Sequence, residues 1–228
     1  MKKCYPFLFA LFYMGVAAGQ VDLSYGFRHL DAPFWDLLLG KDETLFKNGY
    51  SVGAGVQLFR SSERWRLVPS ASFSEFRREP MRVRGGSQTH ARILQLRAPL
   101  RWYPMSYFDH CNCPPFNNGF FLEGSLNWNR FDLSFREPDM HAADRAEAFG
   151  WGFGAGLELA YADWLIITPQ FLFQGIPSIR WEGLGNMRDP QTDYFFREET
   201  FVRKMGFEIH VLLLLYPQQE PVQLPQTP

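Results

Sequence analysis

The sequence lacks long hydrophobic runs beyond its N-terminus and lacks any excess of one charge. After residue 19, the longest unbroken apolar stretch is residues 211–215, far short of the roughly 18 to 20 residues that a membrane-spanning helix needs. The formal net charge is −1, which gives no electrostatic reason to expect a nucleic-acid partner. These absences argue against a helical membrane protein and against a DNA- or RNA-binding protein.

Aromatic side chains, in contrast, are abundant. They make up 17% of the chain, and hydrophobic residues make up 46%, yet the mean hydropathy is only −0.23. A β-barrel with an apolar outer surface and a polar interior would have such a composition. If the mature chain lies in a membrane, it must span it as a closed barrel, because lipid does not tolerate open sheet edges.

The N-terminus has the pattern of a secretory signal peptide. Lys2 and Lys3 precede a short apolar run over residues 6–16, and Ala17 and Ala18 begin a group of small residues. This pattern predicts a signal peptide over residues 1–19, with cleavage before residue 20. The alternative is a membrane anchor, for which the run is short.

Segments of about ten residues with alternating hydrophobicity follow, as in transmembrane barrels. The outward set of the first contains Val21, Leu23, Tyr25 and Phe27, and that of later segments includes Val56, Ala71 and Phe153. The opposite faces are polar or small, which suits a narrow barrel interior. A soluble β-sandwich is the alternative. The eight predicted strands cover residues 21–28, 49–59, 65–76, 90–103, 119–131, 150–162, 164–174 and 200–216.

The predicted connections alternate in length. Those over residues 30–48, 77–89, 132–149 and 175–199 are long. The others are short, except the connection over residues 104–118, which is longer than expected for a turn. In outer-membrane barrels, long loops face outward and short turns face the periplasm. An aromatic girdle is then expected at the periplasmic end, comprising Trp102, Tyr103, Phe120, Phe121, Tyr161, Trp164 and Tyr216. The barrel would cover residues 20–216, and residues 217–228 would form a disordered periplasmic tail.

Two stretches carry a family resemblance. Residues 94–103, LQLRAPLRWY, resemble the L-x-x-P-L-x-x-x-Y strand of the small outer-membrane β-barrel family common in the Bacteroidota, which includes PorT-like proteins with an OmpA-type barrel. Lys204, Gly206, Ile209 and Val211 in the last strand resemble the signal read by the barrel-assembly machinery. The resemblance implies the fold, the location and a transient assembly partner, but no single activity. The tail after residue 216 and the two cysteines near residue 112 depart from the family pattern.

Two local features suggest chemistry. Cys111 and Cys113 lie two residues apart, so a strained local disulfide, an intermolecular disulfide, unpaired thiols and a metal site with neighbouring His110 and Asp109 all remain open; Cys4 would leave with the signal peptide. Arginine binds phosphate by paired hydrogen bonds, so a basic outer loop predicts contact with lipopolysaccharide, the alternative being a solvated loop. That loop contains Arg77, Arg78, Arg82 and Arg84.

The first outer loop is unusually apolar, with Phe34, Trp35, Leu37, Leu38 and Leu39. A cluster of this kind is unlikely to stay in water. It could dip into the membrane, fold over the barrel mouth or bind another outer-membrane protein.

Charged residues of both signs alternate into the predicted interior. Charges in a low-dielectric lumen are costly unless paired, so the balance predicts an internal salt-bridge network and a plugged lumen, with Arg101 and Glu123 as one pair. A charged pore or proton path is the alternative. The predicted network comprises Asp22, Arg28, Arg97, Arg101, Glu123, Glu158, Lys204 and Glu208.

No constellation of a membrane-barrel hydrolase is recognisable, because His210 and Glu208 point inward at mid-barrel. The sequence therefore predicts an eight-stranded antiparallel up-and-down transmembrane β-barrel without a cofactor or metal. It would be a non-enzymatic, structural or accessory outer-membrane component in contact with outer-membrane lipid. A subunit of a secretion or assembly complex and a lipid-modifying enzyme are the alternatives.

Overall fold

The computed structural model describes residues 20–36, 46, 48–57, 59–62, 64–81, 87–104, 119–136, 141–185 and 197–215. The predicted signal peptide, the predicted tail and the Cys111–Cys113 turn lie outside these residues. Among the described residues, no helix has the length and hydropathy needed to cross a membrane.

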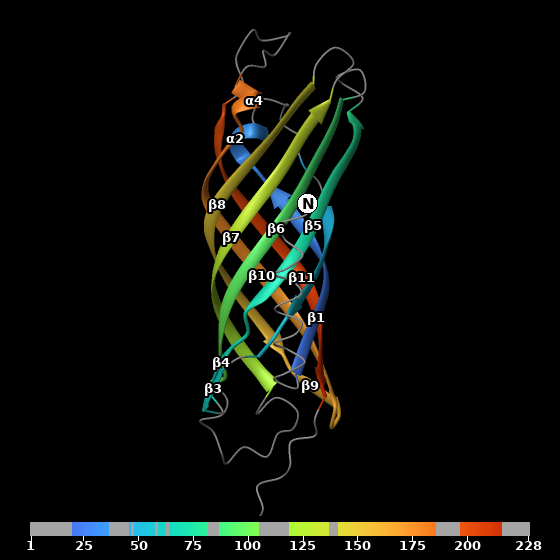
Figure 1. Ribbon diagram of the computed structural model, residues 1–228, viewed down its shortest axis with the longest axis vertical. Coiled ribbons are helices and arrows are strands. Elements are labelled where there is room, and N and C mark those ends of the chain that lie inside the picture. Colours follow the sequence, from blue (N-terminus) through green and yellow to red (C-terminus); the bar gives the residue numbers. More distant parts are fainter. Residues whose placement is uncertain are drawn as a thin grey trace, which may run out of the picture.

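Strands dominate the described chain, and two one-turn helices accompany them (Figure 1). The helices are α2 (Pro33–Asp36) and α4 (Glu182–Gly185). Short strands β3 and β4 flank a tight turn, and β9 continues the line of β8 after a break at residue 158. The strands are β1 (Gln20–Asp31), β2 (Asn48–Gly55), β3 (Phe59–Ser62), β4 (Trp65–Leu67), β5 (Ser70–Met81), β6 (Ser87–Trp102), β7 (Phe120–Arg136), β8 (His141–Leu157), β9 (Leu159–Ala162), β10 (Leu165–Arg180) and β11 (Glu199–Leu214).

The first and last strands pair and close the sheet on itself. Leu23 in β1 lies opposite Ala54 in β2 on one side and opposite Val211 in β11 on the other. Going round, β1 is followed by β2, β5, β6, β7, β8, β10 and β11, each antiparallel to its neighbours. Each of these eight strands therefore has a partner on both sides, so that its backbone groups can be satisfied within the sheet. The prediction of an eight-stranded antiparallel up-and-down barrel is confirmed.

The two ends of the barrel differ (Figure 1). We call the end where Gln20 pairs with Leu214 the terminal end, and the β3–β4 and β9–β10 turns lie there too. The opposite end, which includes α2 and α4, is the loop end. In the predicted orientation, the terminal end is periplasmic.

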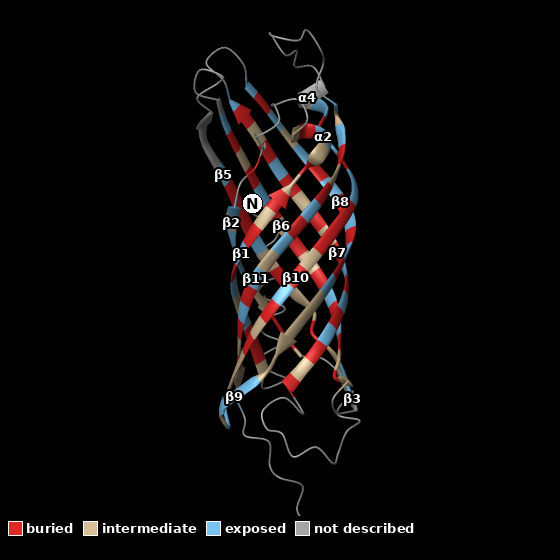
Figure 2. Ribbon diagram, turned by 180° about the vertical axis from the view of Figure 1, so that it is seen from behind, coloured by how far each residue is buried: buried red, intermediate tan, exposed pale blue. Residues whose placement is uncertain are grey.

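Near the terminal end and in the middle, large apolar side chains point outward and polar ones inward. In β1, Leu23, Tyr25 and Phe27 are exposed, whereas Asp22 and Arg28 are buried. Figure 2 shows this alternation of buried and exposed positions along the strands. An apolar belt around a polar interior is the pattern of a barrel in lipid. Three residues of the predicted outward set, Val21, Val56 and Ala71, are nevertheless buried. Ala71 lies between Ala54 and Leu96 in the register, and Val56 and Leu96 pack against it.

Toward the loop end the alternation inverts. In β7, Leu126 points outward and Asn129 inward, but directly after Asn129 the polarity changes: Arg130 and Asp132 face outward while Phe131 faces inward. Leu133 and Phe135 continue the buried apolar set. Polar-out and apolar-in is the pattern of a barrel surrounded by water. The barrel therefore rises beyond its apolar belt as a water-adapted extension.

This extension overturns the predicted boundaries at the loop end. The predicted loop over residues 132–149 is wrong, because β7 runs to Arg136, β8 begins at His141 and the two strands pair throughout. The predicted loops over residues 77–89 and 175–199 are wrong in their bounds too, because β5 runs to Met81, β6 begins at Ser87 and β10 runs to Arg180. Each predicted strand ended where its outward side chains ceased to be apolar, although the backbone ladder continues.

Candidate functional site: the barrel lumen

Among the described residues, the lumen brings many charged side chains together away from water. Near the terminal end, Arg101 Nε lies 3.2 Å from Glu123 Oε2, and Arg101 Nη1 lies 3.4 Å from Glu158 Oε1. Arg66 Nη1 approaches the other Glu158 oxygen at 2.6 Å. The antiparallel register sets these contacts, because Arg101 lies directly opposite Glu123 in β7 and opposite Arg66 in β4.

A second ion cluster centres on Glu208 at mid-barrel. Arg28 reaches Glu208 Oε1 through Nη2 at 2.5 Å and through Nε at 3.2 Å. Arg97 Nη1 lies 3.5 Å from Glu208 Oε2, and Ser51 donates to Oε1 at 3.1 Å. Removing charges from water is costly unless partners compensate. Here β1, β2 and β6 each supply one partner for the Glu208 carboxylate of β11.

Amides extend this cluster across the barrel. Arg28 Nη1 donates to Gln95 and Gln174, at 3.1 Å and 3.2 Å. Gln95 in turn donates to Asn129, and Lys204 Nζ donates to the same Asn129 oxygen at 3.2 Å. These hydrogen bonds join side chains from β1, β6, β7, β10 and β11, so they tie walls that are far apart in the sequence.

His210 belongs to the same interior. Its Nδ1 lies 3.1 Å from Asp22 Oδ2 and its Nε2 lies 3.5 Å from Glu208 Oε2. All three side chains are buried. A histidine between two carboxylates can hold or relay a proton. Ser24 lies opposite His210 in the register, and Ser51 donates its hydroxyl to Glu208. The described residues here do not form a serine–histidine–acid relay.

Glycines on one wall make room for this filling. A Cβ on Gly156 would lie 2.5 Å from the Phe121 ring, and one on Gly152 would lie 2.6 Å from Ser125 Oγ. Both positions face the lumen from β8. The small inward residues of β8 therefore leave space for the side chains opposite them in the neighbouring strand β7, where Phe121 pairs with Gly156 and Ser125 with Gly152.

Two members of the predicted aromatic girdle lie inside the barrel instead. Tyr103 and Phe121 are buried, with ring centroids 5.7 Å apart. Tyr103 donates its hydroxyl to Glu158 at 2.6 Å, and Arg101 stacks over Phe121 at 4.6 Å. Their prediction as outward belt residues is wrong, because one residue's difference in a strand changes the face.

Among the other predicted girdle residues, Tyr161 and Trp164 are exposed outward, as expected. Trp102 stacks on Trp65, with ring centroids 6.2 Å apart. Tyr216 lies outside the described residues.

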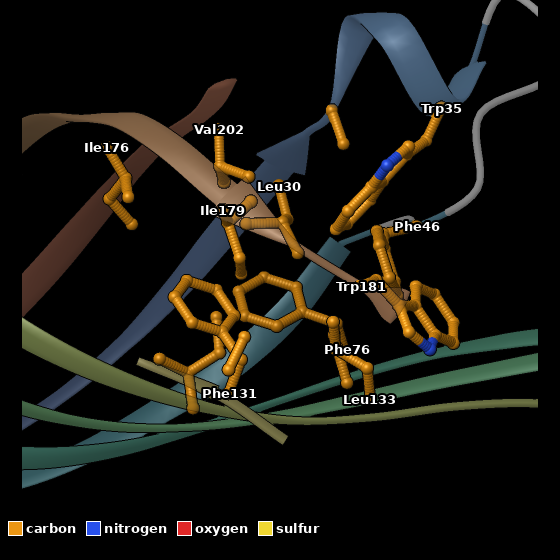
Figure 3. Packing of buried hydrophobic residues seen from close by; sticks show 14 of the residues in the cluster. Leu30, Trp35, Phe46, Phe76, Phe131, Leu133, Ile176, Ile179, Trp181 and Val202 are labelled. Atoms are coloured by element: carbon orange, nitrogen blue, oxygen red, sulfur yellow. The ribbon is translucent and has the colours of Figure 1, made fainter. Parts of the chain in front are cut away.

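Above the polar network, an apolar cluster occupies the lumen toward the loop end (Figure 3). Phe76 comes from β5 and Phe131 from β7, the two strands that flank β6, and Trp35 and Trp181 lie at the mouth. The two indole rings meet edge to face, 5.5 Å apart, and Trp35 also contacts Phe46. The cluster contains Leu30, Ala32, Trp35, Phe46, Phe76, Ala91, Ile93, Phe131, Leu133, Phe135, Ala142, Ala146, Ala148, Ile176, Ile179, Trp181 and Val202.

The apolar first outer loop contributes to this cluster. Helix α2 places Trp35 inside the mouth, whereas Phe34 packs edge to face on Phe201 of β11. Of the three expected fates of this loop, the described part adopts the fold over the barrel mouth. Leu37, Leu38 and Leu39 lie outside the described residues.

All the predicted network residues face the lumen. Arg66 and His210 also belong to the network, although they were not predicted as members. Alternation in the third predicted strand, where Trp65 and Leu67 face outward, would have placed Arg66 inside. Arg77 faces outward near the loop end, whereas Arg82 and Arg84 lie outside the described residues, as does the Arg78 side chain. Within the described part of the chain, no three His, Cys, Asp or Glu side chains are arranged to hold a metal ion.

No known family model and no curated protein matches this sequence. Among solved structures, Neisserial surface protein A (NspA) is similar over 86% of this chain and 96% of its own, at 12% identity and a TM-score of 0.49. The attachment invasion locus protein Ail of Yersinia pestis is similar over 85% of this chain and 98% of its own, at 12% identity and a TM-score of 0.43. The protease OmpT from Escherichia coli is similar over 85% of this chain and 95% of its own, at 6% identity and a TM-score of 0.39. The assignment of the barrel fold rests on the closed hydrogen-bond ladder described above.

Proposed function

We propose that this chain is a non-enzymatic outer-membrane barrel whose lumen is closed and whose loop end forms a rigid platform above the outer leaflet. A leader peptide at residues 1–19 would direct it through the inner membrane. The barrel-assembly machinery would then insert it with the terminal end in the periplasm. Its role would be structural or accessory, presenting the loop end to the cell surface.

The observation that carries this proposal is that two different kinds of filling occupy the lumen in series. Ion pairs and amide hydrogen bonds from facing walls cross the middle and the terminal end. The apolar cluster occupies the loop end. An ion would have to break buried pairs and then enter an apolar core, and both steps are costly. An eight-stranded barrel is also narrow enough for side chains to fill.

Single-channel recording tests the closed lumen. The purified protein, reconstituted in a planar lipid bilayer, should give no steady conductance. Heat-modifiable migration of the same preparation shows that the barrel is folded, so that an absence of conductance is not caused by unfolded protein. Large, stable, ion-selective channels would contradict the proposal.

The location has its own test. Membrane fractionation should recover the protein with the outer membrane, and a variant lacking residues 2–19 should remain in the cytoplasm. Recovery of the full chain in the soluble periplasm would refute the location without bearing on the closed lumen.

A further inference from the structure

The outward surface of the water-adapted extension carries a row of polar side chains. Four cross-strand pairs place Tyr50, Glu75, Arg92, Asp132 and Arg145 next to one another, across β2, β5, β6, β7 and β8. We call this row the collar. Two residues below it on the same strands, toward the terminal end, lie the outward side chains Val52, Phe73 and Leu94. The collar therefore sits at the upper rim of the apolar belt.

One buried carboxylate organises half of the collar. Glu75, only 6% exposed, accepts hydrogen bonds from Arg77 Nη2 at 2.8 Å and Arg77 Nε at 3.1 Å. Arg92 Nε lies 3.4 Å from the same oxygen, and His90 Nε2 lies 2.6 Å from it. The Tyr50 hydroxyl bonds the other oxygen. A single negative charge thus gathers two guanidinium groups and an imidazole.

The gathered arginines stay available to a ligand. The side chain of Arg77 is 69% exposed and that of Arg92 is 46% exposed. Arg77 uses only Nε and Nη2 on Glu75, and Arg92 uses only Nε. A guanidinium has five N–H donors in a planar fork, so several donors on each arginine remain for a second anion.

The opposite sector of the barrel has a different balance. There Arg203 pairs with Asp31, and Arg180 Nη2 lies 2.8 Å from Glu198, so these two arginines each have their own carboxylate. Near Glu75, by contrast, Arg77 and Arg92 share one carboxylate. This sharing gives the β5–β6 side of the rim a local surplus of positive charge.

We propose that Arg77, His90 and Arg92, held by Glu75, form a binding site for a phosphate group on an outer-leaflet lipid of the lipid A class. The inference rests on the proposed outer-membrane location, because it is the apolar belt that sets the cluster at headgroup level. Arginine pairs recognise phosphate by charge-assisted, paired hydrogen bonds. The lipid's acyl chains would lie along the outward Phe73 and Leu94 directly below.

The test compares two double variants with the same change in charge. Arg77→Gln with Arg92→Gln removes the cluster, and Arg180→Gln with Arg203→Gln removes two exposed arginines of the same end in the opposite sector. Each purified barrel is titrated in zwitterionic detergent with lipid A, with dephosphorylated lipid A and with inorganic phosphate. Heat-modifiable migration checks that each variant is folded.

The cluster variant should bind lipid A about tenfold more weakly, as expected for the loss of charge-assisted hydrogen bonds, and the control variant should bind like the parent. Dephosphorylated lipid A should bind parent and cluster variant alike. Equal weakening in both variants, or none in either, would overturn the site. Parent binding of inorganic phosphate as tight as that of lipid A would overturn the lipid assignment. Because these titrations use purified barrel, they stand apart from the test of location.

Discussion

Replacing Arg28 by methionine should strongly destabilise the barrel. The Arg28 guanidinium is buried and binds Glu208 through two nitrogens and Gln95 and Gln174 through a third. Methionine fills much of the same space without charge. The change therefore leaves the buried Glu208 carboxylate without its principal partner.

The size of the loss follows from what remains around Glu208. Leaving one member of a buried ion pair uncompensated costs about 3 to 5 kcal/mol. Ser51 at 3.1 Å and Arg97 at 3.5 Å still face the carboxylate and offset part of this cost. We therefore expect the free energy of unfolding to fall by about 2 to 4 kcal/mol, somewhat less than for a fully uncompensated buried charge.

Urea titration of the barrel in lipid vesicles, followed by tryptophan fluorescence, measures this loss. The second variant adds Glu208→Met to Arg28→Met, which removes the stranded charge. Apolar replacement of a whole buried pair is often close to neutral, so the double variant should regain at least half of the lost stability. Arg145→Met is the matched control, because its ion pair with Asp132 is also short, at 2.6 Å, but exposed. It should change little.

Two results would refute the reasoning. If the double variant were as unstable as Arg28→Met alone, the loss would come from packing rather than from the stranded charge. If Arg145→Met cost as much as Arg28→Met, burial would not be what makes the Glu208 pair matter.

Three further predictions concern other parts of the barrel. Trp181→Ala should lower the free energy of unfolding by about 3 to 5 kcal/mol in the same titration, since the indole is fully buried at the mouth; an unchanged midpoint would mean that the mouth cluster does not stabilise the fold. Phe153→Arg places a charge on the outward belt and should cost about 2 to 4 kcal/mol, whereas a stable variant would place β8 outside the lipid. Truncation after residue 203 removes most of β11, including the proposed assembly signal at Lys204, Gly206, Ile209 and Val211, and should abolish heat-modifiable migration. Insertion of the truncated chain would show that closure does not need the β1–β11 ladder.

The alternation of side chains was enough to predict the part of the barrel that carries the apolar belt. Leu23, Tyr25 and Phe27 face outward and Asp22 and Arg28 inward, as a period of two requires. The same rule predicts that Arg101 and Glu123 lie opposite each other, because adjacent antiparallel strands bring the ends of a hairpin together.

The rule failed where the surroundings of the barrel change. In β7 the period of two continues from Leu126 to Phe135, but its polarity reverses at Arg130. Alternation with apolar side chains outward ends at that residue. Alternation of either polarity continues toward Arg136 and includes the inward apolar side chains that occupy the mouth.

Only the closed tertiary structure decided which residues meet inside. Alternation gives the face of a side chain but not its height in the lumen, which depends on the stagger of strands around the whole barrel. The meeting of Arg28 with Glu208 requires the first strand to pair with the last, and Arg28 reaches Gln174 across a gap of 146 positions. The sequence alone thus determined which side chains form the apolar outer belt, because that depends on local periodicity. Closure determined the ion pairs, the inward position of Tyr103 and the seating of Trp35, because each depends on strands distant in the sequence.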